Sequence, residues 1–126
     1  MSKKNYKLGK EYAYRGQYDK AIKYLEQEVI EGNFDAANDL GVVYERKAAE
    51  YYRIASIGGN KVAIHNIANF YELGKGVSRN LVLARKYYEY SASLGYSHSY
   101  FKLARLYLYG IGVKKNFVKS YQYLKH

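Results

Sequence analysis

Two segments of this chain have nearly the same sequence. Residues 74–80 read GKGVSRN and residues 110–116 read GIGVKKN, 36 positions further along. The similarity continues outside these loops, because Tyr71 and Tyr87 map onto Tyr107 and Tyr123 at the same offset. A repeat of this length is typical of a helix pair that cannot bury its own apolar face and stacks on its neighbours. The chain is therefore predicted to be a helical repeat protein whose surface serves for binding.

Two shorter units precede these copies. Tyr51 lies 36 positions before Tyr87, whereas Tyr44 lies only 27 positions before Tyr71, so nine residues are absent inside this unit. A first unit, with a short turn at residues 15–18, fills the start of the chain. The sequence thus predicts one domain over residues 1–126, with four repeats at about 3–32, 33–59, 60–95 and 96–126.

Apolar and small residues recur within each unit at spacings of three and four, as at Ala63, Ile67 and Phe70. This periodicity predicts α-helices, and no strand pattern competes with it. The predicted helices cover residues 3–15, 18–31, 34–57, 60–73, 80–94, 97–109 and 116–125.

The predicted helix ends carry recognisable residues. Asn80 and Asn116 precede second helices, where their side chains are expected to accept hydrogen bonds from backbone N–H groups. Glycine is expected to end the earlier second helices in the left-handed conformation, at Gly32, at Gly58 or Gly59, and at Gly95.

Small residues in the middle of the first helices are expected to mark the seam where a neighbouring helix approaches closely. About four in five of the eighteen tyrosines are expected in the core or at its rim, where a phenol fills volume and hydrogen-bonds at its tip. The seam residues are Gly9, Gly41, Ala68 and Ala104.

The nine missing residues correspond to residues 73–81, the whole turn between two helices. Residues 35–57 contain no proline and only one glycine, Gly41, so they predict one continuous helix of about 23 residues, near 34 Å long. The two halves of such a helix cannot fold back on each other, and each would complete its core with another molecule in a domain-swapped homodimer. A tight turn around residues 45–47 in an ordinary monomer is the alternative that the sequence leaves open.

The composition indicates the cellular compartment in which the protein is expected. No run of about 18 apolar residues occurs, and no apolar stretch follows the basic start, so neither a membrane span nor a signal peptide is expected. The absence of cysteine removes disulfides, thiol catalysis and thiolate metal sites, and it fits the reducing cytoplasm. A mature secreted or periplasmic form is the alternative location.

The net charge of +10 is unevenly distributed, since no acidic residue follows Glu89. A positive field of this kind favours anionic partners, which include acidic proteins, nucleic acids and lipid headgroups. The basic residues of this last third include Lys102, Arg105, Lys114, Lys115, Lys119 and Lys125.

Residues 67–95 combine Tyr71, a Gly-x-Gly-Val loop, Ala84 and the pair Tyr87-Tyr88, and residues 103–126 repeat most of this pattern. The pattern resembles the Sel-one-like repeat (SLR) family, a branch of the tetratricopeptide-like (TPR-like) α/α solenoids. Residues 6–36 are closer to a plain tetratricopeptide repeat, which has a shorter turn.

The resemblance implies an all-α fold, a right-handed α/α superhelix of about four helix-turn-helix repeats. The second repeat departs from this pattern, because it has lost its turn and is predicted to be fused into one long helix. It also implies a protein–protein adaptor or scaffold rather than an enzyme, of a kind frequent in bacteria and in eukaryotic protein quality control. Asn80 and Asn116 depart from the family, because an acidic residue usually stands at these positions.

No catalytic, cofactor or metal site emerges from the sequence. His65, His98 and His126 form no helical pair of metal ligands, and His65 is expected on an exposed helix face. Ser97 and Ser99 are better explained by capping at the start of a helix than as nucleophiles. The Gly-x-Gly loops lack the preceding strand and third glycine of a nucleotide-binding loop, so we expect no cofactor.

The predicted binding surface is the concave side, formed by first-helix positions outside the seam. Aliphatic and aromatic side chains among polar neighbours suit an extended peptide or a helix of a partner protein. A nucleic-acid or anionic-surface binder that uses the basic last third is the alternative. Charge reversal at Lys102 and Arg105 is expected to weaken partner capture without lowering the melting temperature. The predicted groove residues are Lys7, Lys10, Glu11, Asp39, Val42, Val43, Asn66, Asn69, Phe70, Lys102, Arg105 and Leu106.

Overall fold

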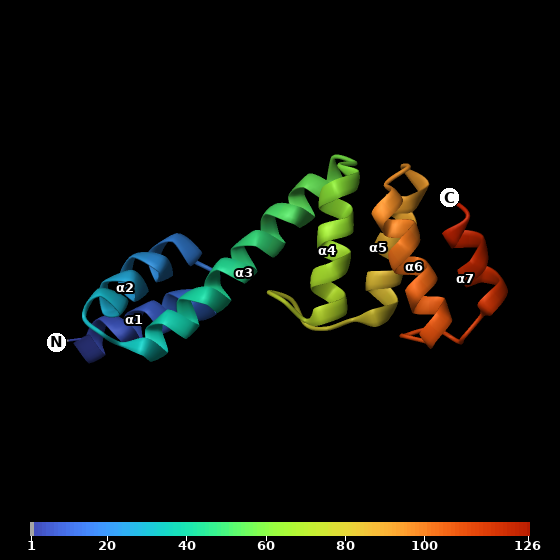
Figure 1. Cartoon of the computed structure of the whole chain (residues 1–126). Helices are drawn as coiled ribbons and strands as arrows, with labels where there is room; N and C mark the ends of the chain where they lie inside the picture. The colour runs from blue at the N-terminus through green and yellow to red at the C-terminus, as the bar shows by residue number, and fades with distance from the viewer. Residues whose placement is uncertain (1) are drawn as a thin grey trace. The chain divides into compact units, whose positions relative to one another are not determined.

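This computed structural model describes the backbone of residues 2–126 and the side chains of residues 4–126. Over that part of the chain it is all-α and contains no strand, as predicted (Figure 1). Every helix end agrees with the sequence prediction to within one residue. The helices are α1 (Ser2–Tyr14), α2 (Tyr18–Ile30), α3 (Phe34–Ile57), α4 (Lys61–Leu73), α5 (Leu81–Ser93), α6 (Ser97–Tyr109) and α7 (Phe117–Leu124).

The chain divides into two compact units. The first unit ends at Ala48 and the second covers Ala49–His126, so the division falls inside α3. The single domain expected over residues 1–126 stays a prediction.

The core of the first unit forms where α2 and the first half of α3 meet, with tyrosines of α1 packed against it. Ala21 and Leu25 of α2 and Ala36 and Val43 of α3 are almost fully buried. On α1, a Cβ added to Gly9 would lie 2.9 Å from the side chain of Leu25. The predicted close approach of a neighbouring helix is therefore confirmed at this position.

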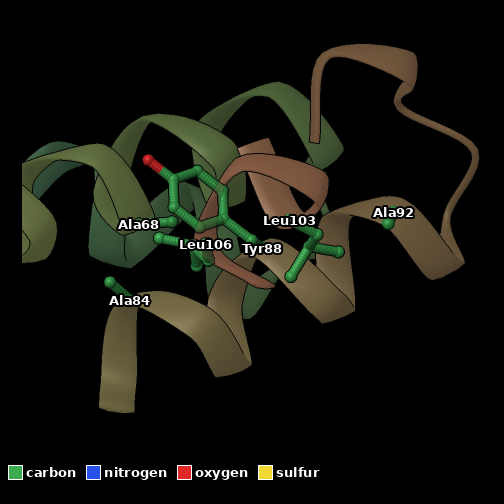
Figure 2. Close-up of a cluster of buried hydrophobic side chains, with 6 residues drawn as sticks. All are labelled: Ala68, Ala84, Tyr88, Ala92, Leu103 and Leu106. Carbon is green, nitrogen blue, oxygen red and sulfur yellow. The ribbon is translucent and has the colours of Figure 1, made fainter. Parts of the chain in front are cut away.

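In the second unit, α4 to α7 pack on one another in chain order (Figure 1). Figure 2 shows the ring of Tyr88 from α5 among small and aliphatic side chains of α4, α5 and α6. Tyr88 has no solvent exposure, which leaves its hydroxyl dependent on protein partners. The other members of this core cluster are Ala68, Ala84, Ala92, Leu103 and Leu106.

The predicted helix ends are confirmed. Asn80 and Asn116 accept hydrogen bonds at 3.0 and 2.9 Å from the backbone N–H groups of Leu83 and Lys119. The glycines expected to adopt positive φ do so, with values of 92° at Gly32, 80° at Gly59 and 88° at Gly95.

The second repeat is one uninterrupted helix. α3 runs through 24 residues, Phe34–Ile57, and contains no turn at residues 45–47. The prediction of a fused helix is confirmed, and its length is about 36 Å at 1.5 Å per residue.

The tyrosines are less buried than predicted. Six of the eighteen are exposed, whereas the sequence analysis expected about four. The exposed tyrosines are Tyr14, Tyr44, Tyr51, Tyr90, Tyr109 and Tyr121.

Within residues 2–126, no helix combines the length and the apolar character that crossing a membrane requires.

Candidate protein-binding surface

The first unit brings together predicted groove residues from two helices. Lys7, Lys10 and Glu11 are exposed on α1, where they line one pocket. A second pocket of about 180 Å³ is lined by Lys10 together with Asp39 and Val42 of α3. The structure therefore places an ammonium group, a carboxylate and an aliphatic side chain around one hollow.

Tyr6 holds the carboxylate of this pocket in place. Its hydroxyl donates a hydrogen bond of 2.5 Å to Oδ2 of Asp39. This bond raises the pKa of Tyr6 to about 12, with smaller contributions from burial and from the negative charges of Asp39 and Asp35. The ammonium of Lys10 lies 5.0 Å from the centre of the Tyr6 ring. A positive and a negative group are thus fixed beside each other and both can meet a partner.

In the second unit the predicted residues lie on α4 and α6, and all are partly buried except Leu106. The ring of Phe70 makes an edge contact with Tyr52 at 5.3 Å, and the ammonium of Lys75 lies 5.7 Å from its centre. This side of Phe70 is already packed, which limits how much of the ring a partner can cover. The partly buried residues are Asn66, Asn69, Phe70, Lys102 and Arg105.

Two predicted groove residues lie in the interior. Val43 is 2% exposed in the core of the first unit, and Leu106 is 1% exposed in the core of the second. A partner cannot reach these side chains, so they are removed from the candidate surface. Each of them lies on the side of its helix that packs into the core of its unit, so it is not available on the predicted concave surface.

Arg105 connects α6 to a buried acid that the sequence analysis missed. Its guanidinium forms an ion pair with Oε2 of Glu72 on α4, and the hydroxyl of Tyr88 donates to Oε1 of Glu72 at 2.9 Å. Glu72 is only 8% exposed. The available signal was its position four residues after the seam residue Ala68, which places it on the same helix face. Because of this pair, charge reversal at Arg105 is expected to lower the melting temperature, contrary to the expectation from sequence.

His65 was wrongly assigned to an exposed face. Its Nδ1 lies 2.7 Å from Oγ of Ser99, which donates to Oγ of Ser91 at 2.8 Å. Its ring also contacts the rings of Tyr88 and Tyr96, with centroids 5.3 and 5.0 Å away. Burial, with smaller contributions from the positive charges of Lys102 and His98, lowers the pKa of His65 to about 4.

The fold places this histidine beside the hydroxyl of Ser99, as a nucleophile and its base would be placed. Ser99 has no solvent exposure, however, and its hydroxyl links α6 to Ser91 of α5. The expected capping role at the start of α6 is wrong as well. The residue before the helix is Tyr96, and no side chain caps this end. Within residues 4–126, no three His, Cys, Asp or Glu side chains are grouped closely enough to hold a metal ion.

His65 makes stability dependent on pH. Below pH 6.5 the unfolded chain gains a proton on this imidazole, whereas the folded chain stays neutral there until about pH 4. The free energy of unfolding is therefore expected to fall by about 1 kcal/mol per pH unit between pH 6.5 and 4.5. In urea titrations, His65→Gln should flatten this slope, while His126→Gln, at an exposed position, should keep it. Equal slopes in the two variants would contradict the assignment.

The sequence model of the Sel1 repeat family matches residues 5–27, 45–60, 61–96 and 97–125, which is most of the chain. The chain belongs to the Sel1 repeat family. The residues between the first two matches, 28–44, include the first half of α3. The fused second repeat is thus the place where this chain departs furthest from the family pattern.

Comparison with known proteins found a similar sequence and two similar folds. The chain is 33% identical over 82 residues to DAP3-binding cell death enhancer 1 from Rattus norvegicus, an alignment that covers 60% of this chain and 16% of the rat protein. The crystal structure of c5321, a protective antigen of uropathogenic Escherichia coli strains with an SLR fold, superposes with a TM-score of 0.63 and 27% identity. That superposition covers 98% of this chain and 29% of c5321. A Sel1 repeat protein from Oxalobacter formigenes superposes with a TM-score of 0.62 and 22% identity, over 82% of this chain and 86% of that one.

Membership of the Sel1 repeat family indicates a general class of function. Proteins of this family generally mediate protein–protein interactions and are typically non-enzymatic scaffolds. The chain spans less than a third of the rat protein and of c5321, so what those whole proteins do does not transfer directly.

Proposed function

We propose that this chain is a protein-interaction module, an adaptor or scaffold that binds an extended peptide or a helix of a partner protein against the first helices of its repeats. Its cytoplasmic location is part of the proposal and rests on the absence of cysteine. Each unit offers its own surface: α1 with the first half of α3, and α4 with α6.

One observation supports the proposal most directly. The pocket of about 180 Å³ in the first unit combines the exposed aliphatic side chain of Val42 with the opposite charges of Lys10 and Asp39. An apolar side chain of a peptide fits the hollow, while its backbone or charged groups meet the ammonium and the carboxylate. Because Asp39 is held by Tyr6, little side-chain entropy is lost when a peptide binds to it.

The test is selection of binding peptides from a random displayed library on the intact chain, followed by titration calorimetry. Lys10→Glu is expected to weaken the selected peptides about tenfold or more, since it reverses one charge of the pocket. Its melting temperature should stay within about 2 °C of the parent chain, because surface substitutions change stability by about 0.5 kcal/mol or less.

Lys23→Glu is the matched control, since Lys23 is an exposed lysine of α2 outside both pockets of the first unit. It should leave peptide affinity unchanged. Peptides whose affinity responds equally to both substitutions bind through net charge alone, which would reject this pocket as the site.

The nucleic-acid alternative rests on the basic last third of the chain, where Lys114 and Lys115 are exposed. Retention on heparin or single-stranded DNA that falls steeply with salt would favour it. Retention that disappears in Lys114→Glu with Lys115→Glu, while peptide binding is unchanged, would separate the two activities.

A further inference from the structure

We propose that α3 is a dimerisation helix. It pairs in antiparallel orientation with α3 of a second copy of this chain, so that the first half of each α3 packs on the second half of the other. Differences between the second repeat and the other three point to this pairing, which is independent of the peptide-binding proposal.

Three of the four repeats contain a stacked pair of tyrosines, one from the first helix and one from the second. The pairs occupy equivalent repeat positions and have nearly parallel rings. They are Tyr12 on Tyr24 at 5.6 Å and 7°, Tyr71 on Tyr87 at 5.8 Å and 7°, and Tyr107 on Tyr123 at 5.9 Å and 20°.

In the second repeat the equivalent tyrosines are Tyr44 and Tyr51, which both lie on α3. Seven residues separate them, which is about 10 Å along a helix axis, so the stack of the other repeats cannot form between them in one chain. Tyr44 is 47% exposed and Tyr51 is 59% exposed, whereas Tyr71 and Tyr87 are partly buried. The two positions of the stack are present in each chain, but the fused helix separates them.

The seam position of α3 gives an independent observation. A Cβ added to Gly9 of the first repeat would lie 2.9 Å from Leu25, and Ala68 and Ala104 of the later repeats are buried. At Gly41, the equivalent position of α3, an added Cβ meets no atom within 4 Å. Glycine at position 41 would therefore allow a neighbouring helix to approach closely, but no helix of the first unit occupies that position.

The same face of α3 carries a continuous stripe with the alternating spacing of four and three that two antiparallel helices need. Its small residues allow the helix backbones to approach closely, and none of its members is among the buried residues of α3, which include Val43 and Ala49. Pairing along the stripe therefore leaves the existing cores intact. The stripe consists of Ala37, Gly41, Tyr44, Ala48, Tyr51 and Ala55.

The register follows from the intact third repeat. Tyr71 stacks on Tyr87, so the equivalent contact places Tyr44 on Tyr51 of the partner subunit. Ala68 shares a core cluster with Ala84, so Gly41 lies beside Ala48 of the partner subunit. A twofold axis near the middle of α3 makes both contacts twice, as in other isologous dimers. A second copy is the occupant to which the sequence points, because it carries both halves of the interrupted hairpin.

The first experiment measures mass by light scattering during size-exclusion chromatography at about 50 µM. The expected mass is twice 14.6 kDa. Gly41→Arg is expected to raise the dissociation constant of the dimer at least a hundredfold without loss of helix. In a single chain the new side chain points into open space, whereas in the dimer it would clash with α3 of the partner. Glu50→Arg, at an exposed position of α3 outside the stripe, is the control and should remain dimeric. A parent chain of 14.6 kDa, or a Gly41→Arg variant that stays dimeric, would overturn the proposal.

A second variant restores the missing turn. Residues 73–81 of the third repeat, LGKGVSRNL, are inserted between Glu45 and Arg46, where the alignment of the repeats places the deletion. The longer chain is expected to form its second hairpin within one molecule and to become monomeric with unchanged helical content. A dimer that persists after this insertion would show that the fused helix is not the cause of association.

The register has its own test, which benefits from a chain without cysteine. Tyr44→Cys and Tyr51→Cys are prepared as separate chains and then mixed and oxidised. A disulfide between positions 44 and 51 of different chains, found only in the mixture by peptide mass spectrometry, is the expected result. Cross-links no more frequent than for Glu50→Cys mixed with Tyr44→Cys would reject the register.

Discussion

Replacing Arg105 with methionine is expected to lower the free energy of unfolding by about 3 kcal/mol, although this residue lies on the candidate binding surface. The substitution keeps most of the apolar stem and removes the guanidinium that pairs with Glu72. The carboxylate of Glu72 is then left nearly buried with the hydroxyl of Tyr88 as a donor. Removal of one partner from a buried ion pair is costly, because the other charge loses water without gaining a partner.

A double-mutant cycle measured by urea unfolding separates this effect from general damage. Glu72→Gln combined with Arg105→Met should cost about 1–3 kcal/mol less than the sum of the two single variants, because the second substitution removes the group that the first leaves unpaired. Lys102→Met is the control for loss of a positive charge on α6, since its ammonium makes no ion pair among the described residues. A change of less than about 0.5 kcal/mol is expected for it. Additive single variants would contradict the role assigned to Glu72.

Gly112→Ala is the second substitution with a large expected effect, about 3 kcal/mol of lost stability. Gly112 has a φ of 67°, a conformation that costs an alanine about 1 kcal/mol. An added Cβ would also lie 2.4 Å from Cβ of Leu81, at the start of α5, so the loop must shift away from its neighbour. Overpacking of this kind costs about 1–3 kcal/mol.

Gly95→Ala provides the matched comparison. Gly95 also has a positive φ, 88°, but an added Cβ meets nothing within 4 Å. It should lose only the conformational part, about 1 kcal/mol. The difference between the two variants in thermal or urea unfolding then measures how tightly the loop before α7 packs on α5. Equal losses would show that the loop moves aside at little cost.

The local structure of this chain was predictable from neighbouring residues. Asn80 and Asn116 set helix starts, and Gly74 and Gly110 end first helices in the left-handed conformation, because capping involves only residues within one turn. The continuity of α3 followed from counting residues against the other repeats and from the absence of a residue that turns the chain. These features depend on short segments, so the sequence contains all of their determinants.

The predictions that failed concern pairs of residues far apart in the sequence. His65 was expected at the surface, but Tyr88, Tyr96 and Ser99 enclose it. Glu72 was missed because its two partners come from α5 and α6, 16 and 33 residues away. Periodicity identifies the face of a helix that a residue occupies, but the depth of burial on that face depends on the size of the side chains facing it.

By itself, the sequence determined that this chain is a series of helix pairs with one missing turn, because repeat spacing and helix capping are local and additive. Only the tertiary structure decided which seam position is filled and which is open. Gly9 and Gly41 occupy equivalent positions of two repeats, yet Leu25 packs against the first and no atom approaches the second. The physical reason is that the same residue is buried or exposed according to whether the chain returns a second helix to it, and at α3 the chain does not turn back.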